Sequence, residues 1–236
     1  MKLRLEGLEK RFDKKEVLKG ASFTFEQGLI YGLLGRNGAG KTTLFNCLNE
    51  DIPTDGGSFC LEDDIGVCRP LGPEDVGYVL STPVVPEFLT ATEFVKFFLD
   101  INRRKIPYPK APDVYLDYMH IEPEDRHKLL KDFSHGMKNK MQMLVNFIAN
   151  PSVFLLDEPL TSFDVVMADE MKELLRRIKN EHITILSTHI LDLALDLCDE
   201  IVILHQGVLQ PVPRHQLDDE AFKDRIIAAL KEDDHA

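Results

Sequence analysis

Hydrophobic and polar residues alternate along the first part of the chain in the pattern of β-strands. LRLEGL (residues 3–8) and ASFTFEQG (21–28) place apolar side chains at about every second position, which is typical of strands with one buried face. LIYGLLG (29–35) is an almost continuous apolar run and indicates a strand buried on both faces. The glycine-rich run 35–50 then predicts a loop that continues as a helix, and the turn-rich residues 51–80 suggest small strands.

The periodicity changes after residue 84. ATEFVKFFLDINRR (91–104), DVYLDYMH (113–120) and EDRHKLLKDF (124–133) predict helices, and a proline-rich stretch separates the first from the second. The next segment carries apolar side chains at i, i+4, i+7, i+8 and i+11, the stripe of a helix that Pro151 ends. These patterns predict a mainly helical block between two regions that contain strands.

Strands and helices alternate again in the last third of the chain. The apolar runs 151–159 and 182–189 predict strands, whereas 168–180 and 191–200 predict helices, and two short strands follow before residue 213. We expect an amphipathic helix and an acidic end in the tail. The predicted division is an α/β core with a β subdomain (residues 1–84 and 151–212), an inserted helical subdomain (85–150) and a C-terminal tail (213–236).

The composition is that of a soluble globular protein, with 44% apolar and 29% charged residues among 236. The formal net charge is −12, and the absence of a basic block argues against nucleic-acid binding, because phosphate contacts need clustered Lys and Arg. We find no apolar signal segment at the start and no run near the ~20 apolar residues of a membrane span. Any action at a membrane is therefore expected to need a partner that crosses it.

The four cysteines form no C-x-x-C pair and no metal-like spacing with histidine. Cytosolic proteins keep their thiols reduced, and free cysteines are among the most buried residues. We therefore expect reduced, mostly buried thiols in a cytosolic compartment.

Residues 35–42, GRNGAGKT, match the phosphate-binding pattern G-x-x-x-x-G-K-[ST]. Glycines let the backbone fold so that successive N–H groups point at phosphates, and the helix that follows presents its positive end to them. We expect Lys41 to reach the β- and γ-phosphates and the Thr42 hydroxyl to ligate Mg2+. The alternative is a structural glycine turn, but a buried strand before the loop and a helix after it favour phosphate binding.

A second apolar strand, VFLLDEP, ends in two acids. Asp157 follows four apolar residues and so lies at the carboxyl end of a buried strand, where open α/β sheets bind ligands. We expect Asp157 to hold Mg2+ through a water, and Glu158 to act as general base on an attacking water. A solvated strand end is the alternative.

The segment FSHGMKNK (133–140) allows different interpretations. Its adjacent serine and histidine suggest a hydrolase, but adjacent side chains cannot easily aim at each other and no third orienting residue is evident. Ser134 is a favourable helix N-cap, and Gly136 leaves backbone N–H groups open to an anion. We favour a helix start that contacts an anion, and a plain helix cap is the other alternative.

Four motifs in this order, GRNGAGKTT, FSHGMKNK, VFLLDEPLTSFD and ILSTH, resemble the nucleotide-binding subunit of ABC transporters over about residues 3–212. The resemblance implies an α/β fold of the P-loop NTPase type, with a RecA-like core, an antiparallel β subdomain and an inserted α-helical subdomain. It implies an ATPase that binds ATP and Mg2+ and pairs head-to-tail with a second nucleotide-binding subunit. That pair would drive a separate integral membrane permease from the cytoplasmic face of the cell membrane.

The resemblance also assigns site residues. FSHGMKNK corresponds to the signature that contacts the γ-phosphate of ATP bound to the opposite subunit, His189 to the switch histidine and Asp164 to the end of the D-loop. Phe12 would stack on adenine, although a core phenylalanine is the alternative. The residues assigned to ATP are Phe12, Val17, Gly35, Arg36, Asn37, Gly38, Ala39, Gly40, Lys41, Thr42 and Thr43, and those assigned to the signature are Ser134, His135, Gly136 and Met137.

Leu160, Ser162 and Phe163 vary the D-loop pattern, and three further positions also depart from the family. His135 stands in place of a glycine, and Met137 in place of a glutamine. Ser81, in GYVLSTP, stands where the family has a glutamine that ligates Mg2+ and senses the membrane domain; the shorter serine would act through a bridging water or not at all. The GMK form resembles exporters of antibiotics and peptides, so export is favoured over import. A soluble ABC ATPase without transport, or an ATP-binding regulatory module without turnover, are the alternatives.

Overall fold

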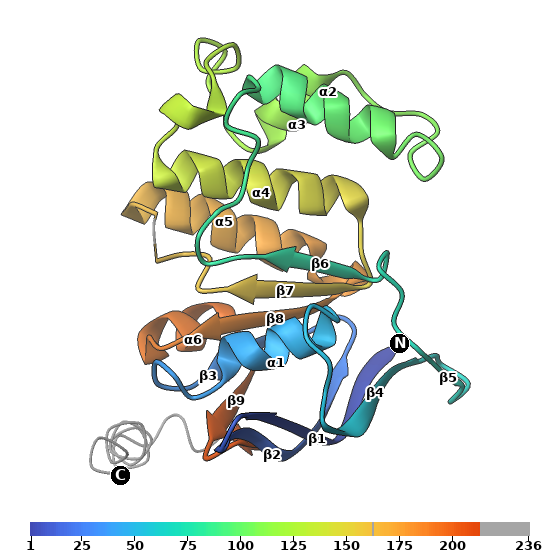
Figure 1. The fold of residues 1–236 in the computed structure, drawn as a ribbon. Coiled ribbons are helices and arrows are strands. Elements are labelled where there is room, and N and C mark those ends of the chain that lie inside the picture. The colour runs from blue at the N-terminus through green and yellow to red at the C-terminus, as the bar shows by residue number, and fades with distance from the viewer. Residues whose placement is uncertain (162, 213–236) are drawn as a thin grey trace.

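The computed structural model describes residues 1–161 and 163–212 of the chain (Figure 1). The strands are β1 (Lys2–Phe12), β2 (Lys15–Glu26), β3 (Ile30–Leu34), β4 (Gly56–Glu62), β5 (Cys68–Arg69), β6 (Val76–Val79), β7 (Val153–Asp157), β8 (Ile183–Thr188), β9 (Glu200–His205) and β10 (Val208–Val212). The helices are α1 (Lys41–Leu48), α2 (Ala91–Ile101), α3 (Pro112–Tyr118), α4 (His135–Ala149), α5 (Val165–Ile178) and α6 (Leu191–Leu197), with 3-10 turns η1 (Leu130–Asp132) and η2 (Lys179–Glu181). The predicted tail helix lies outside the described residues.

The strands form a four-stranded sheet in the order β2-β1-β4-β5 and a six-stranded sheet in the order β10-β9-β3-β8-β7-β6. In the first, all pairings are antiparallel. In the second, only the edge strand β10 is antiparallel to its neighbour. Figure 1 shows α4 and α5 stacked beside β6 and β7, with α2 and α3 beyond α4. The α/β fold class and its antiparallel β portion are therefore confirmed, while the boundaries of the helical subdomain stay a prediction.

The parallel register of three central strands places their carboxyl ends at one edge of the sheet. Leu34 at the end of β3 pairs with Thr188 at the end of β8, and Asp157 at the end of β7 pairs with Ser187. The glycine-rich loop, the acids and the histidine that follow these strands therefore start from neighbouring points. Ligands of open α/β sheets bind at such an edge.

Two apolar cores lie on opposite faces of the six-stranded sheet, because successive side chains of a strand point to opposite faces. Along β3, Ile30 and Leu34 belong to the core shared with α2 to α6, whereas Tyr31 and Leu33 belong to the core shared with α1 and the antiparallel sheet. All residues of β3, β7 and β8 are buried. The site thus lies at the carboxyl ends of three fully buried strands.

The prediction of a helix over residues 124–133 is wrong, because tertiary contacts use the backbone of this segment. The amide of Leu130 donates to the carbonyl of Leu89 (2.8 Å), and the carbonyl of Arg126 accepts from the amide of Thr92 (3.1 Å). The Arg126 guanidinium binds the carbonyl of Ile121 and carboxylates of α3. Only the short turn η1 remains of the predicted helix.

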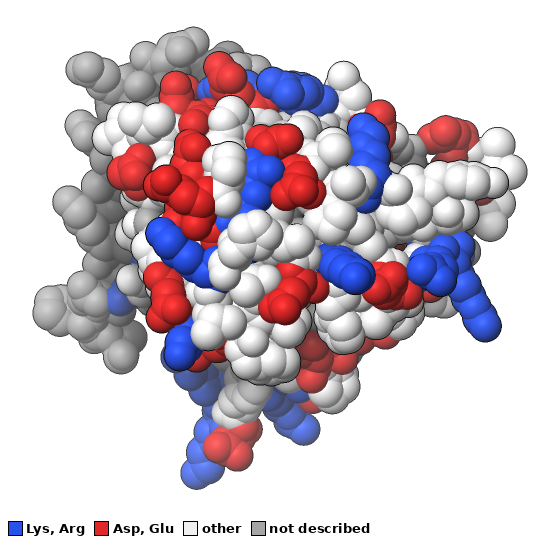
Figure 2. Space-filling model, turned by 90° about the horizontal axis from the view of Figure 1, so that it is seen from above, with Lys and Arg blue, Asp and Glu red and all other residues white. Residues whose placement is uncertain are grey.

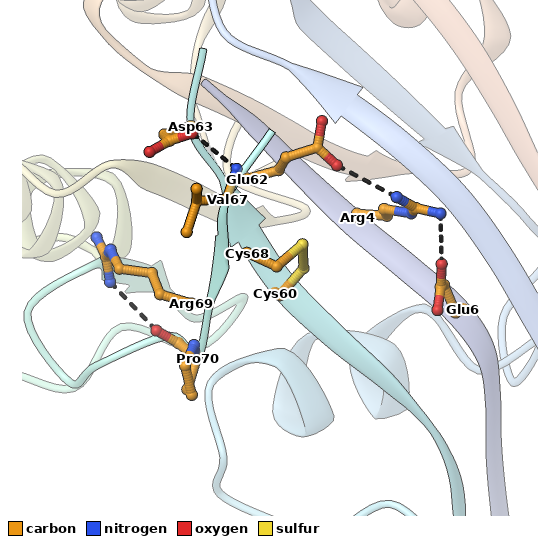
Figure 3. The surroundings of a disulfide bond; sticks show 9 residues. All are labelled: Arg4, Glu6, Cys60, Glu62, Asp63, Val67, Cys68, Arg69 and Pro70. Carbon is orange, nitrogen blue, oxygen red and sulfur yellow. Dashed lines mark hydrogen bonds and ion pairs between the residues drawn. A yellow bond between two sulfur atoms is a disulfide. The ribbon is translucent and has the colours of Figure 1, made fainter. Parts of the chain in front are cut away.

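The prediction that all cysteines are reduced is wrong for two of the four. Cys60 on β4 and Cys68 on β5 form a disulfide that closes the small hairpin at the sheet edge (Figure 3). The hairpin turn is also held by the Val67 amide, which donates to the Asp63 carboxylate (2.8 Å). Cys47 and Cys198 are free and buried, as predicted, and burial raises the pKa of the Cys198 thiol to about 12.

The surface carries charges of both signs. In the view of Figure 2, Lys and Arg side chains are interspersed with Asp and Glu over the visible face. Across the residues that the structure describes, we find no helix whose length and apolar character would let it span a membrane.

Candidate functional site

The glycine-rich loop between β3 and α1 forms a turn that glycine makes possible. Gly38 and Gly40 adopt φ values of +83° and +106°, which residues with a Cβ rarely adopt. A Cβ on Gly40 would also lie 2.7 Å from a methyl group of Val17. The helix α1 begins directly after Gly40, so its free N–H groups face the loop.

Lys41 is buried at the start of α1 and its ammonium group turns back over the loop. It donates to the carbonyl oxygens of Gly35 (2.6 Å) and Arg36 (3.3 Å), and lies 3.6 Å from Oε1 of Glu158. Burial lowers the pKa of Lys41, and the nearby carboxylates of Glu158 and Asp157 oppose that shift. The cation is thus held among oxygen atoms at the sheet edge.

Thr42 and Asp157 meet although they are 115 positions apart in the sequence. The Thr42 hydroxyl donates to Oδ2 of Asp157 (2.7 Å), and the Ser187 hydroxyl donates to Oδ1 of the same carboxylate (2.5 Å). Asp157 is 2% exposed, so these contacts fix its orientation. Ser187 was not among the predicted site residues; its signal is a polar residue one position before the end of the buried run ITILST, in register with Asp157.

Glu158 and His189 form the second pair at this edge. The His189 Nδ1 atom lies 2.9 Å and 3.0 Å from the two carboxylate oxygens of Glu158. The Glu158 backbone has φ = +50° and is held by its amide, which donates to the carbonyl (3.2 Å) and hydroxyl (3.1 Å) of Ser187. Strained backbone of this kind clusters at functional sites, where surrounding contacts determine it.

A cavity of about 460 Å³ lies at this edge, and the predicted residues His189, Gly35 and Ala39 are not among those that line it. It brings together the predicted residues Phe12, Val17, Arg36, Asn37, Gly38, Gly40, Lys41, Thr42, Thr43, Ser81, Asp157 and Glu158. Lys15, the first residue of β2, also lines it and was missed, because a single lysine at the start of a strand carries no sequence signal. Phe12 is 46% exposed with the Lys10 ammonium 5.4 Å from its ring centre, so it is not a core residue.

The signature segment lies apart from this cavity wall. Ser134 caps α4, its hydroxyl accepting from the Met137 amide (3.2 Å), as predicted. Ser134 and His135 are exposed, whereas Gly136 is buried. Asp164 caps α5 in the same way, accepting from the Met167 amide (2.9 Å), and it is also exposed. Neither cap is among the residues that line the cavity.

A phosphate-binding loop after β3, a buried Asp at the end of β7 and a Glu–His pair at the same edge define a nucleoside triphosphatase of the P-loop class. The family model described as ABC transporter matches residues 18–161. An uncharacterized ABC transporter ATP-binding protein of Methanocaldococcus jannaschii is 35% identical over 208 residues, which cover 87% of this chain and 75% of that protein. A lantibiotic transport ATP-binding protein of Streptococcus pyogenes is 28% identical over 209 residues, 87% of each chain.

The fold leads to the same family. A solved structure described as the ATP-binding subunit of an ABC transporter superposes with a TM-score of 0.79 at 26% identity, covering 98% of this chain and all of that one. The chain therefore belongs to the ABC transporter family, as an ATP-binding subunit, and it is an ATPase.

Proposed function

We propose that this subunit hydrolyses ATP as one half of a head-to-tail pair of nucleotide-binding subunits, and that the pair drives a separate membrane permease from the cytoplasmic face. The observation that carries the proposal is the cluster of Lys41, Thr42, Asp157, Glu158 and His189 at one sheet edge. At this edge the Lys41 ammonium and the N–H groups at the start of α1 would bind phosphates, and the Glu158 carboxylate, paired with His189, lies beside them. Those are the elements that phosphoryl transfer to water requires.

ATP would lie along the cavity, with its phosphates over residues 35–43 and its adenine on the exposed ring of Phe12. Backbone N–H groups at the start of α1 and the Lys41 ammonium favour the phosphates electrostatically. The ring of Phe12 stands on the same cavity wall as Val17, which would pack beside the base.

The oxygen atoms at this edge fit Mg2+. Thr42 Oγ1 and Asp157 Oδ2 lie 2.7 Å apart, and hard divalent cations prefer hydroxyl and carboxylate oxygens. Thr42 would bind the ion directly and Asp157 through a water, while Ser81 on the cavity wall could contribute only through a bridging water. When bound, Mg2+ would neutralise charge on the phosphates.

Glu158 would accept the proton of the attacking water, and His189 would hold the Glu158 carboxylate in place and contact the γ-phosphate. Their 2.9 Å contact orients the carboxylate, whose exposed fraction is 16%. A general base must lie within hydrogen-bond reach of the proton that it removes. The position of Glu158 directly after Asp157 places it beside the phosphate-binding edge.

Ser134 to Met137 would act on ATP held by the second subunit. In support, the Ser134 cap is exposed and lies outside the residues that line its own cavity. The exposed residues Ser134 and His135 at the start of α4 and the exposed Asp164 cap would thus face the second subunit.

The test of this mechanism is Glu158→Gln. We expect ATP hydrolysis to fall by about 10²–10⁴-fold, the usual worth of a general base, while ATP binding persists and a dimer accumulates in size-exclusion chromatography. The matched control is Glu173→Gln, at an exposed position of α5, with unchanged turnover. An unaltered rate in Glu158→Gln would exclude Glu158 as the base. Separately, Lys41→Ala should lose nucleotide affinity in calorimetry.

For the direction of transport we propose export, supported by the GMK form of the signature segment and by similarity to a lantibiotic transport ATP-binding protein. The permease would be isolated by its association with the affinity-tagged subunit. In inside-out vesicles that contain the complex, an exporter accumulates its cargo on addition of ATP, whereas an importer depletes preloaded cargo. Failure to find any membrane protein in association would favour the alternative of a soluble ABC ATPase.

A further inference from the structure

A buried amide side chain of α4 holds the loop that carries Ser81. Gln142 is 6% exposed, and its Oε1 atom accepts a hydrogen bond from the backbone amide of Val84 at 2.9 Å. The Val84 side chain is 70% exposed. The loop is therefore fixed at this point through its backbone, while its side chain lies in solvent.

Fixing Val84 also restricts Ser81, because the connection between them is short and stiff. Only Thr82 and Pro83 lie between the two residues. Proline fixes its own φ and disfavours helical backbone at the residue before it. Leu80 alone lies between the end of β6 at Val79 and Ser81, so the segment is tied to the sheet at one end and to α4 at the other.

The helix α4 also packs closely on β6, at Gly77. A Cβ on Gly77 would lie 2.9 Å from Oδ1 of Asn146 on α4. One turn before Gln142, Asn139 of α4 is fully buried and its Nδ2 atom donates to the carbonyl of Pro159 (2.8 Å), directly after Glu158. Two amides on one helix thus hold the two loops that carry Ser81 and Glu158.

We propose that Gln142 is a positioning residue for ATP turnover, which acts by keeping Ser81 at the wall of the cavity. The proposal rests on the proposed function, in which that cavity holds ATP. Gln142 itself does not line the cavity. Its loss should therefore slow turnover through the placement of the Ser81 loop and leave the phosphate-binding residues 35–43 intact.

The test compares Gln142→Met, which keeps the length but removes the acceptor, with Gln142→Glu, which keeps an oxygen acceptor. For Gln142→Met we expect kcat for ATP hydrolysis to fall about fivefold with KM for ATP nearly unchanged, the size expected for one neutral hydrogen bond. Gln142→Glu should restore most of the rate. The matched control is Asn146→Ala, because the Asn146 side chain donates to the backbone of its own helix (2.9 Å) and should not affect kcat.

A second comparison asks whether Gln142 acts through Ser81. In a Ser81→Ala background the effect of Gln142→Met should shrink, since coupled residues are not additive. An undiminished effect, an unchanged kcat in Gln142→Met, or a parallel rise of KM would each overturn the proposal. A wild-type protein without ATP hydrolysis would instead refute the proposed function.

Hydrogen exchange in the wild-type protein tests the contact without any variant. The Val84 amide hydrogen should exchange with solvent more slowly than is usual for a residue with an exposed side chain, because the amide donates a hydrogen bond to Gln142. Rapid exchange at Val84 in the nucleotide-free wild type would overturn the proposal, even where Gln142→Met fails to fold.

Discussion

We expect a glycine at position 158 to give a more stable fold than an alanine, although alanine is usually the more stabilising of the two residues. The φ of Glu158, +50°, lies in the left-handed region, which costs a residue with a Cβ roughly 1–2 kcal/mol. The contacts that impose it are the bonds from the Glu158 amide to Ser187 and from the Thr161 hydroxyl to the Glu158 carbonyl (2.8 Å). Glu158→Gly and Glu158→Ala both delete the carboxylate with its contacts to Lys41 and His189, so only the Cβ distinguishes them.

The magnitude follows from two opposing terms. Removal of the left-handed penalty favours glycine, whereas the greater freedom of glycine in the unfolded chain costs roughly 0.4–1 kcal/mol. We expect Glu158→Gly to exceed Glu158→Ala in free energy of unfolding by about 0.5–1 kcal/mol, a Tm difference of roughly 2 °C. Urea unfolding with equal m-values for the two variants would measure it. An alanine variant as stable as the glycine variant would show that the turn relaxes and that Glu158 is not strained.

Three further predictions concern other parts of the molecule. Cys60→Ser should lower the free energy of unfolding by up to about 2.5 kcal/mol, the chain-entropy value for a separation of 8 residues, in oxidising buffer but not with dithiothreitol. Thiol titration of the unfolded, unreduced wild type should find Cys68 blocked. Ser81→Gln should lower the Mg2+ concentration for half-maximal ATPase activity, because a longer amide reaches the ion site without a water. The Arg69 side chain depresses the pKa of Asp75 below its ordinary 3.8. That pair stabilises the fold above pH 3.8 and its contribution disappears as pH falls through the lower folded pKa, so Arg69→Ala should unfold at a higher pH in acid titrations followed by circular dichroism.

The elements that the sequence predicted correctly are those whose causes are local. Alternation marks β1 and β2, and a serine followed by an apolar stripe marks the start of α4 at Ser134, where the cap hydrogen bond spans three residues. The segment 124–133 has a helical pattern too, but hydrogen bonds to Leu89 and Thr92 outweigh its intrinsic preference. The Cys60–Cys68 pair is only 8 positions apart, but it requires the β4–β5 register that pairs Glu62 with Cys68, and the cysteine spacing alone does not specify that register.

The residues of the candidate site divide in the same way, into those that a local motif identifies and those that only the fold brings together. Residues 35–42 and Asp157 belong to motifs in which neighbours in sequence share one task, so a pattern of a few letters suffices to find them. Ser187 contributes through hydrogen bonds with residues 29 and 30 positions away, and Gln142 through one with a residue 58 positions away. Such bonds are specified only by the strand order and by the packing of α4 on β6. Sequence reasoning from one chain therefore finds the groups that would touch phosphate and misses those that hold them in place.

The contacts of α4 give a physical reason why its first residues could report on the ATP of their own subunit. The exposed Ser134 end would contact ATP in a partner, while Asn139 and Gln142, on the same helix, are bonded to the loops after Glu158 and Ser81. A helix transmits a displacement along its axis because its backbone bonds make it stiff over a few turns. We expect a change that a nucleotide imposes on either loop to act on α4 at Asn139 or Gln142, within about two turns of the Ser134 end. The Ser81 side chain is short. We therefore expect its loop to be coupled to α4 through the hydrogen bond from the Val84 amide to Gln142, rather than through the Ser81 side chain.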